Sequence, residues 1–140
     1  MVLVSAAVLA ACSGGSGGGS GGASEDLATT TAVAAPSVPE SEYVDLTASA
    51  EVTIQAVDNS FRPKYATIRR GTTVTFVNDG RTVHNVIPAV AGQFTPVESE
   101  EFGPDQSASR TFGDPGIVPY FCSLHGTAAK GMVGGLRVVE

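Results

Sequence analysis

Short runs of alternating apolar and polar residues fill the chain after residue 50, and they constrain its fold more than any other feature. In the first run Val52, Ile54 and Ala56 alternate with polar residues. Successive side chains of an extended strand point to opposite faces, so this period of two is typical of half-buried β-strands. With turn residues between the runs, the pattern predicts strands over six further segments: 65–69, 73–77, 82–87, 107–112, 117–122 and 133–139. We therefore expect an all-β chain of seven to eight short strands at the spacing of a sandwich.

The composition agrees with many short strands joined by tight turns. The 140 residues include 17 Gly and 8 Pro, which suit turns far better than long helices. No segment has the periodicity of a helix. Residues 48–140 have the length of one two-sheet domain, which we expect to be the folded part.

The charge pattern argues against a nucleic-acid partner. The formal net charge is −6, and the 8 basic residues are scattered from Arg62 to Arg137. No basic stripe is available to neutralise phosphates, so we expect no binding of nucleic acid. Four acidic residues lie between positions 98 and 105, where they either steer a basic partner or only keep the loop soluble: Glu98, Glu100, Glu101 and Asp105.

The N-terminus resembles an export signal that ends at a lipidation site. Residues 1–11 are apolar and small, and they are too few to span a bilayer as a permanent helix. The ending Leu9-Ala10-Ala11-Cys12 resembles the lipobox of bacterial lipoproteins, in which the signal is cleaved before a cysteine that receives a diacylglyceryl group. Cys12 would then anchor the protein to the cell membrane. The start departs from the pattern because it carries no Lys or Arg, and the alternative is an apolar N-terminus with an idle cysteine.

Residues 12–47 are expected to form a flexible, lipid-anchored linker. Positions 13–22 are Gly and Ser alone, and positions 23–47 are rich in Ala, Thr, Ser, Pro and acidic residues without a sustained period. Such a composition buries too little apolar surface to offset the entropy of ordering. The linker would let a tethered carrier swing between partners, or it would only clear the cell envelope.

The residues that can bind a soft metal are few, and most of them lie close together near the C-terminus. The chain has two histidines, His84 and His125, and beyond position 12 one cysteine, Cys122, and one methionine, Met132. A thiolate, two imidazoles and a thioether suit copper, whereas Ca²⁺ and Mg²⁺ prefer oxygen ligands. Zinc would accept the first three but has no redox use for a thioether. Each residue taken singly is more often structural, but the grouping favours an electron-transfer copper site.

The sequence around these residues resembles the plastocyanin, amicyanin and auracyanin branch of the cupredoxins. Two C-terminal motifs match the copper loop of that branch: Tyr120-Phe121-Cys122-Ser123-Leu124-His125-Gly126 and Gly131-Met132-Val133-Gly134. An upstream series follows the same order: Phe61-x-Pro63, Ile68, Gly71-Thr72-x-Val74-x-Phe76-x-Asn78 and His84-Asn85-Val86. The resemblance covers residues 50–140, which is essentially the whole of the expected domain.

This resemblance implies a Greek-key β-sandwich that binds one type 1 copper ion. It implies three equatorial ligands and one axial ligand: His84, Cys122 and His125, then Met132. Asn85 and Ser123 would match the pair that hydrogen-bonds the two ligand loops together and tunes the metal. Six residues, 126–131, separate His125 from Met132, which is more than in plastocyanin. The longer loop either bulges or holds the sulfur away from the metal.

We therefore expect a monomeric one-electron carrier outside the cytoplasm, with redox proteins as donor and acceptor. It is not expected to be an enzyme, because a nitrite reductase or multicopper oxidase needs further histidines for a second copper centre. Two alternatives stay open. One is an extracytoplasmic copper carrier or chaperone with the same ligands, and the other is a receptor-binding or adhesive sandwich without metal.

Overall fold

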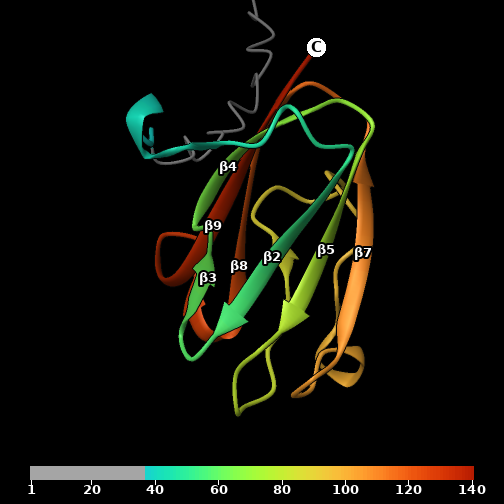
Figure 1. The fold of residues 1–140 in the computed structure, drawn as a ribbon. Coiled ribbons are helices and arrows are strands. Elements are labelled where there is room, and N and C mark those ends of the chain that lie inside the picture. Colours follow the sequence, from blue (N-terminus) through green and yellow to red (C-terminus); the bar gives the residue numbers. More distant parts are fainter. Residues whose placement is uncertain (1–36) are drawn as a thin grey trace, which may run out of the picture. The chain divides into compact units, whose positions relative to one another are not determined.

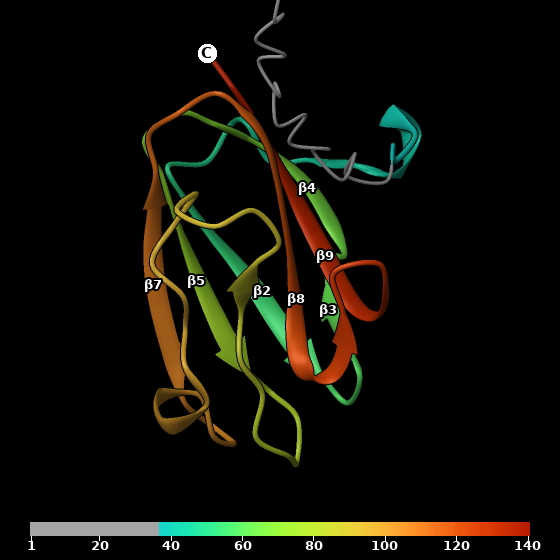
Figure 2. The same cartoon turned by 180° about the vertical axis from the view of Figure 1, so that it is seen from behind.

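Two β-sheets face each other in the part of the chain that the computed structural model describes, residues 37–140 (Figures 1 and 2). The five-stranded sheet, here the β9 sheet, has the order β1 (Val44–Asp45), β4 (Tyr65–Arg69), β9 (Lys130–Val139), β8 (Gly116–Thr127) and β6 (Ile87–Pro88). The four-stranded sheet, here the β5 sheet, has the order β3 (Ser60–Arg62), β2 (Glu51–Val57), β5 (Thr72–Asn78) and β7 (Ser107–Phe112). The predicted all-β Greek-key sandwich is confirmed.

The chain crosses repeatedly between the two sheets, so several neighbouring strands in a sheet are not consecutive in the sequence. In the β5 sheet, β2 pairs with β5 in parallel and β5 pairs with β7 antiparallel. In the β9 sheet, β4 pairs with β9 in parallel, and β8 and β9 form an antiparallel hairpin. Among residues 37–140 the remaining regular elements are two 3₁₀ turns, η1 (Glu40–Glu42) and η2 (Ser99–Glu101), and none of the described helices is long and apolar enough to cross a membrane.

The core lies between the sheets and is built by the period of two that the sequence shows. Along β2 and β5 buried and less buried residues alternate, which directs Ile54 and Phe76 inward. Tyr120 of β8 crosses the core between two aromatic rings, with its centroid 5.0 Å from Phe61 and 5.4 Å from Phe76. Gly134 of β9 makes room for this ring, because a Cβ at that position would lie 2.5 Å from Tyr120 Cε2. The core thus fixes the parts of β8 and β9 that lie next to the predicted metal ligands Cys122 and Met132.

The strand predicted over residues 82–87 is wrong for most of its length. Strand β6 contains only Ile87 and Pro88, and Val86 forms an isolated bridge with Val97. Residues 82–85 belong to a loop, here the His84 loop (79–86). The Asn78 side chain holds this loop in a folded conformation through hydrogen bonds with the backbone of Gly80 and Thr82. The polar side-chain contacts of the loop therefore override its local alternation.

The folded part begins earlier than the predicted domain boundary at residue 48. Strand β1 pairs in parallel with β4, and Leu46 packs against the core. Tyr43 lies 5.5 Å from the ring of Tyr65, and Glu40 is paired with Arg137. Residues 40–46 fall within the predicted linker because they lack a clear period, but pairing with the edge of an existing sheet needs only a short strand. The predicted signal peptide 1–11, the Cys12 anchor and linker residues 12–36 lie outside the described residues.

The strand count also differs slightly from the seven to eight that were expected. Residues 37–140 contain nine strands. Three of them, β1, β3 and β6, have only two or three residues each, which is too short for an alternating pattern to show in the sequence. The loop after β5 and the bend of β8 before its turn to β9 both lie at the lower end of the sandwich in Figure 1, and the C-terminus lies at the upper end. This lower end is where the predicted metal ligands belong.

Candidate metal centre

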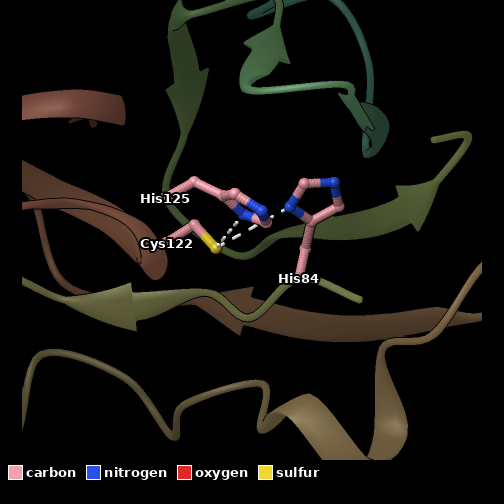
Figure 3. A group of neighbouring side chains, drawn as sticks. All are labelled: His84, Cys122 and His125. Carbon is pink, nitrogen blue, oxygen red and sulfur yellow. Dashed lines mark hydrogen bonds between the residues drawn. The ribbon is translucent and has the colours of Figure 1, made fainter. Parts of the chain in front are cut away.

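Three predicted ligands converge at this end of the sandwich from two separate segments (Figure 3). His84 comes from the loop after β5, whereas Cys122 and His125 come from β8. The Cys122 Sγ atom lies 3.7 Å from His84 Nδ1 and 3.4 Å from His125 Nδ1. All three donor atoms lie within 4.8 Å of one another. Within residues 37–140 this is the one group of at least three His, Cys, Asp or Glu residues whose donor atoms lie close enough together to hold a metal ion.

A bulge in β8 turns Cys122 and His125 toward the same point. Phe121 pairs with Val133, but the next pair along the hairpin is Gly126 with Gly131. The four residues 122–125 therefore stand opposite the single residue Met132. A bulge bends the strand and changes the direction of its side chains, so two residues three positions apart can both face His84.

The His84 imidazole is buried, which favours its neutral form. Its residue is 0% exposed, and its ring centroid lies 4.6 Å from that of His125. Burial, and secondarily the nearby His125, hold the pKa of His84 below its usual value, although Asp58 acts in the opposite direction. Both effects disfavour the imidazolium, because burial removes its hydration and the His125 ring beside it does not favour a positive charge. A neutral ring keeps a nitrogen lone pair available for a metal.

Asn85 and Ser123 join the two segments that carry the ligands. Asn85 Nδ2 donates to Ser123 Oγ at 2.8 Å, and the Ser123 backbone N–H donates to Asn85 Oδ1, also at 2.8 Å. Asn85 follows His84 in the chain, and Ser123 follows Cys122. This pair of hydrogen bonds, here the Asn85–Ser123 clamp, fixes the His84 loop against β8 and so limits how far the donors can separate.

Asn78 is a further structural element of the site whose role the sequence analysis did not assign. Its side chain is 0% exposed, and Nδ2 donates to the backbone oxygens of Thr82 and Phe102 at 2.8 Å each. Its Oδ1 accepts the N–H of Gly80 at 3.0 Å. The sequence Asn78-Asp79-Gly80 by itself predicts only a turn, and the position of Asn78 in the family motif is the one signal for a further role.

Met132 lies directly across from the bulge and is fully buried. It shares the inward face of β9 with Gly134 and Leu136, as Cys122 shares the inward face of β8 with Tyr120. The six residues before it do not form an open loop. Gly126 pairs with Gly131 and Thr127 with Lys130, so they extend the hairpin beyond the ligands. A Cβ on Gly131, whose φ is 89°, would lie 2.6 Å from His125 O, which explains why a glycine occupies this position.

The donor set fits a first-row metal ion in both chemistry and spacing. With metal–nitrogen and metal–sulfur bonds of about 2.0 and 2.3 Å, a trigonal ion would hold a nitrogen and a sulfur about 3.7 Å apart. The two sulfur–nitrogen distances here are 3.7 and 3.4 Å. Two imidazoles and a thiolate around a trigonal site are typical of electron-transfer copper. The chemistry of the residues therefore agrees with the predicted copper ion.

Comparisons with known proteins point to the same metal. Residues 48–139 match the family described as copper binding proteins, plastocyanin/azurin family. A chloroplastic plastocyanin from Physcomitrium patens is 37% identical over 81 residues, which cover 52% of this chain and 48% of that protein, so the chain spans about half of this relative. Amicyanin from Paracoccus versutus superposes with a TM-score of 0.53 at 27% identity over 64% of this chain and 81% of the amicyanin chain.

A copper-containing nitrite reductase from Thermus scotoductus also resembles the fold. It superposes with a TM-score of 0.53 at 32% identity over 64% of this chain, but the match covers only 22% of the reductase. The shared part is thus a single sandwich from a much longer enzyme chain.

Proposed function

This chain belongs to the plastocyanin/azurin family of copper binding proteins, and we propose that it carries single electrons through one type 1 copper ion. The prediction of a copper cofactor is confirmed by the family match together with the His84, Cys122 and His125 cluster. The observation that carries the proposal is the convergence of one sulfur and two nitrogens within 4.8 Å. When bound, copper supplies a one-electron couple between its Cu(I) and Cu(II) states.

The role of the protein is to hold these donors in one arrangement for both copper states. Cys122 is 0% exposed and lies on a strand that the core packs firmly, so its thiolate has little freedom to move. The Asn85–Ser123 clamp ties this strand to the His84 loop. A rigid donor set keeps small the rearrangement that accompanies each electron transfer, because neither copper state can pull the ligands to its own preferred geometry.

Met132 is proposed as the axial ligand. Its burial and its place opposite the four-residue bulge support this role, since the side chain lies inward on the strand next to Cys122. The extra residues between His125 and Met132 form the hairpin tip, and they do not lengthen the span between the ligand strands.

Electrons are proposed to enter and leave through His125. His84 is 0% exposed, whereas His125 is only partly buried and so reaches closer to solvent. Leu124 beside it is 53% exposed and Val83 in the His84 loop is 42% exposed, which gives this end of the sandwich an apolar surface. Pro88, which the sequence analysis placed in this surface, is buried and does not contribute to it. An apolar surface over the ligand allows a redox partner to approach it closely.

We also propose that the protein acts outside the cytoplasm as a monomer tethered through lipidated Cys12. The support is the Leu9-Ala10-Ala11-Cys12 sequence and the Gly and Ser tract that follows it. Mass spectrometry of the mature protein tests the proposal. The expected N-terminus is a diacylglyceryl-modified Cys12, and a mature chain that retains residues 1–11 would contradict it.

No catalytic role is included in the proposal. The chain has two histidines in all, and both belong to the cluster, so its 140 residues hold no further imidazole for a second copper centre. The donor and acceptor are proposed to be redox proteins. The four acidic residues between positions 98 and 105 would favour a partner with a basic surface.

Absorption spectroscopy and metal analysis test the proposed function. The oxidised protein is expected to contain one copper ion and to be intensely coloured, because a copper–thiolate bond gives strong charge-transfer absorption. Reduction should remove the colour rapidly and reversibly without loss of copper. Cys122→Ser should abolish the colour and leave a folded domain. Loss of copper on each reduction would favour a copper carrier, and a domain that ignores added copper would favour an adhesive sandwich.

A further inference from the structure

We propose that Thr82 is a positioning residue for His84, because its hydroxyl accepts the Nε2–H proton of the imidazole and holds the ring with Nδ1 toward Cys122. The Thr82 Oγ1 and His84 Nε2 atoms are 3.4 Å apart. The inference rests on the proposed copper function, and it adds a residue outside the ligand set and the clamp.

The two nitrogens of His84 face opposite surroundings. Nδ1 points toward Cys122 Sγ at 3.7 Å, and the second ring nitrogen points away from the cluster (Figure 3). A ligand that offers the Nδ1 lone pair to a metal carries its proton on Nε2. Because His84 is 0% exposed, that N–H needs a partner within the protein, and a buried donor without one is costly.

Thr82 is the residue whose side chain meets this need in the described part of the chain. The His84 loop passes close to Nε2, since a Cβ added to Gly80 would lie 3.3 Å from that atom. Because residue 80 is a glycine, no side chain from it lies against Nε2, and the Thr82 hydroxyl lies at hydrogen-bond distance from this atom. The threonine therefore covers the only polar atom of the ring that does not face the metal site.

The backbone of Thr82 is held in place by the buried Asn78. Asn78 Nδ2 donates to Thr82 O at 2.8 Å, and Asn78 Oδ1 accepts the N–H of Gly80 at 3.0 Å. The same Nδ2 reaches Phe102 O, which also accepts the backbone N–H of His84 at 3.2 Å. The backbones of Thr82 and His84 are thus both held by hydrogen bonds to Asn78 and Phe102. These bonds fix the position of the Thr82 hydroxyl relative to the imidazole.

A hydroxyl has a particular advantage at this position because it can donate as well as accept. In the metal-free protein it serves Nε2 whichever ring nitrogen carries the proton. Metal at Nδ1 leaves only the tautomer with Nε2–H, for which the hydroxyl becomes the acceptor. The ring can therefore bind metal without rotating, and removal of the hydroxyl should weaken metal binding more than folding.

Three variants of the full-length protein separate this role from a general effect of the loop. Thr82→Val keeps the shape and removes the hydroxyl, whereas Thr82→Ser keeps the hydroxyl. Thr73→Val is the matched control, because Thr73 Oγ1 hydrogen-bonds Thr111 Oγ1 at 3.1 Å on β5, at the strand end remote from the His84 loop. The affinity for copper is measured by competition with a chelator, and unfolding of the metal-free proteins in urea is the control for stability.

Thr82→Val is expected to lower copper affinity roughly tenfold, the effect of losing one hydrogen bond to a buried donor. Thr82→Ser and Thr73→Val should keep the wild-type affinity, and all metal-free proteins should unfold at similar urea concentrations. In the diamagnetic Cu(I) protein, ¹H–¹⁵N NMR reports the Nε2–H of His84 directly. Its signal should shift and exchange faster with water in Thr82→Val and be restored in Thr82→Ser.

Wild-type affinity and an unchanged Nε2–H signal in Thr82→Val would overturn the inference. A Thr82→Ser protein as weak as Thr82→Val would also overturn it, because the methyl group and not the hydroxyl would then be responsible. A wild-type protein that binds no copper would remove the proposed function and this inference together. Failure of the inference alone therefore has its own signature, a copper-binding protein that is indifferent to the residue at position 82.

Discussion

Asn85→Ala should destabilise the protein and loosen the metal site by removing the Asn85–Ser123 clamp. Asn85 is 5% exposed and forms two side-chain hydrogen bonds with Ser123, each 2.8 Å long. A typical intramolecular hydrogen bond contributes about 0.5–1.5 kcal/mol net to stability. The substitution removes both, so the free energy of unfolding should fall by about 2 kcal/mol. Ser123→Ala removes only one of them and should cost about 1 kcal/mol.

Urea unfolding of the metal-free and copper-loaded proteins measures both effects of this substitution. A ligand that binds only the native state raises its stability in proportion to the logarithm of its concentration over its dissociation constant. The difference in stability between loaded and metal-free protein therefore reports copper affinity. In Asn85→Ala this difference should shrink, because His84 and Cys122 lie on the two segments that the clamp joins.

Two results would refute this reasoning. A loss of less than about 0.5 kcal/mol in metal-free Asn85→Ala would mean that solvent replaces the clamp without cost. A full loss of stability with an unchanged response to copper would mean that the clamp supports the fold but does not position the ligands. Ser123→Ala provides the internal scale, since it must fall between the wild type and Asn85→Ala.

Three further predictions follow from other parts of the structure. Met132→Leu should keep the colour and raise the reduction potential, because a sulfur donor supports Cu(II) more than a methyl group does. A shift of roughly 59 mV corresponds to a tenfold change in the relative binding of the two copper states. An unchanged potential by voltammetry would show that the sulfur lies away from the metal. Gly134→Ala should cost about 1–3 kcal/mol in thermal or urea unfolding through overpacking, since its Cβ would lie 2.5 Å from Tyr120; adding Tyr120→Leu should recover part of this loss, and an equal cost in both backgrounds would refute the clash. Electron transfer to a cationic redox protein should slow steeply as ionic strength rises if residues 98–105 steer the encounter, and a rate indifferent to salt would leave these acidic residues a role in solubility only.

The sequence was sufficient to predict the sandwich because several strands have one buried and one less buried face. That period of two survives in β2, β5 and β8, where local preference and tertiary packing agree. The identities of His84, Cys122 and His125 were equally accessible, because residues of these types are otherwise nearly absent from the chain. Their convergence was not accessible from periodicity, since it depends on a bulge that interrupts the register between Phe121 and Gly126.

The features missed by the sequence analysis are those that depend on single side-chain contacts. Residues 82–85 alternate like a strand, but Asn78 captures the backbone of this segment and folds it into a loop. Residues 44 and 45 have no period of their own, yet they pair with the edge of β4. In both cases the deciding partner is distant or buried, so no local pattern can reveal it.

The pairing of Gly126 with Gly131 separates the hairpin tip from His125 and Met132, which flank it. The residues between His125 and Met132 form a turn whose two sides pair with each other, Gly126 with Gly131 and Thr127 with Lys130. We therefore expect that residues inserted or exchanged between positions 127 and 130 leave the register of β8 and β9 unchanged, because the Gly126–Gly131 pair lies between this tip and the rest of the hairpin. A change in the length of this tip should therefore leave the distance between His125 and Met132 unchanged.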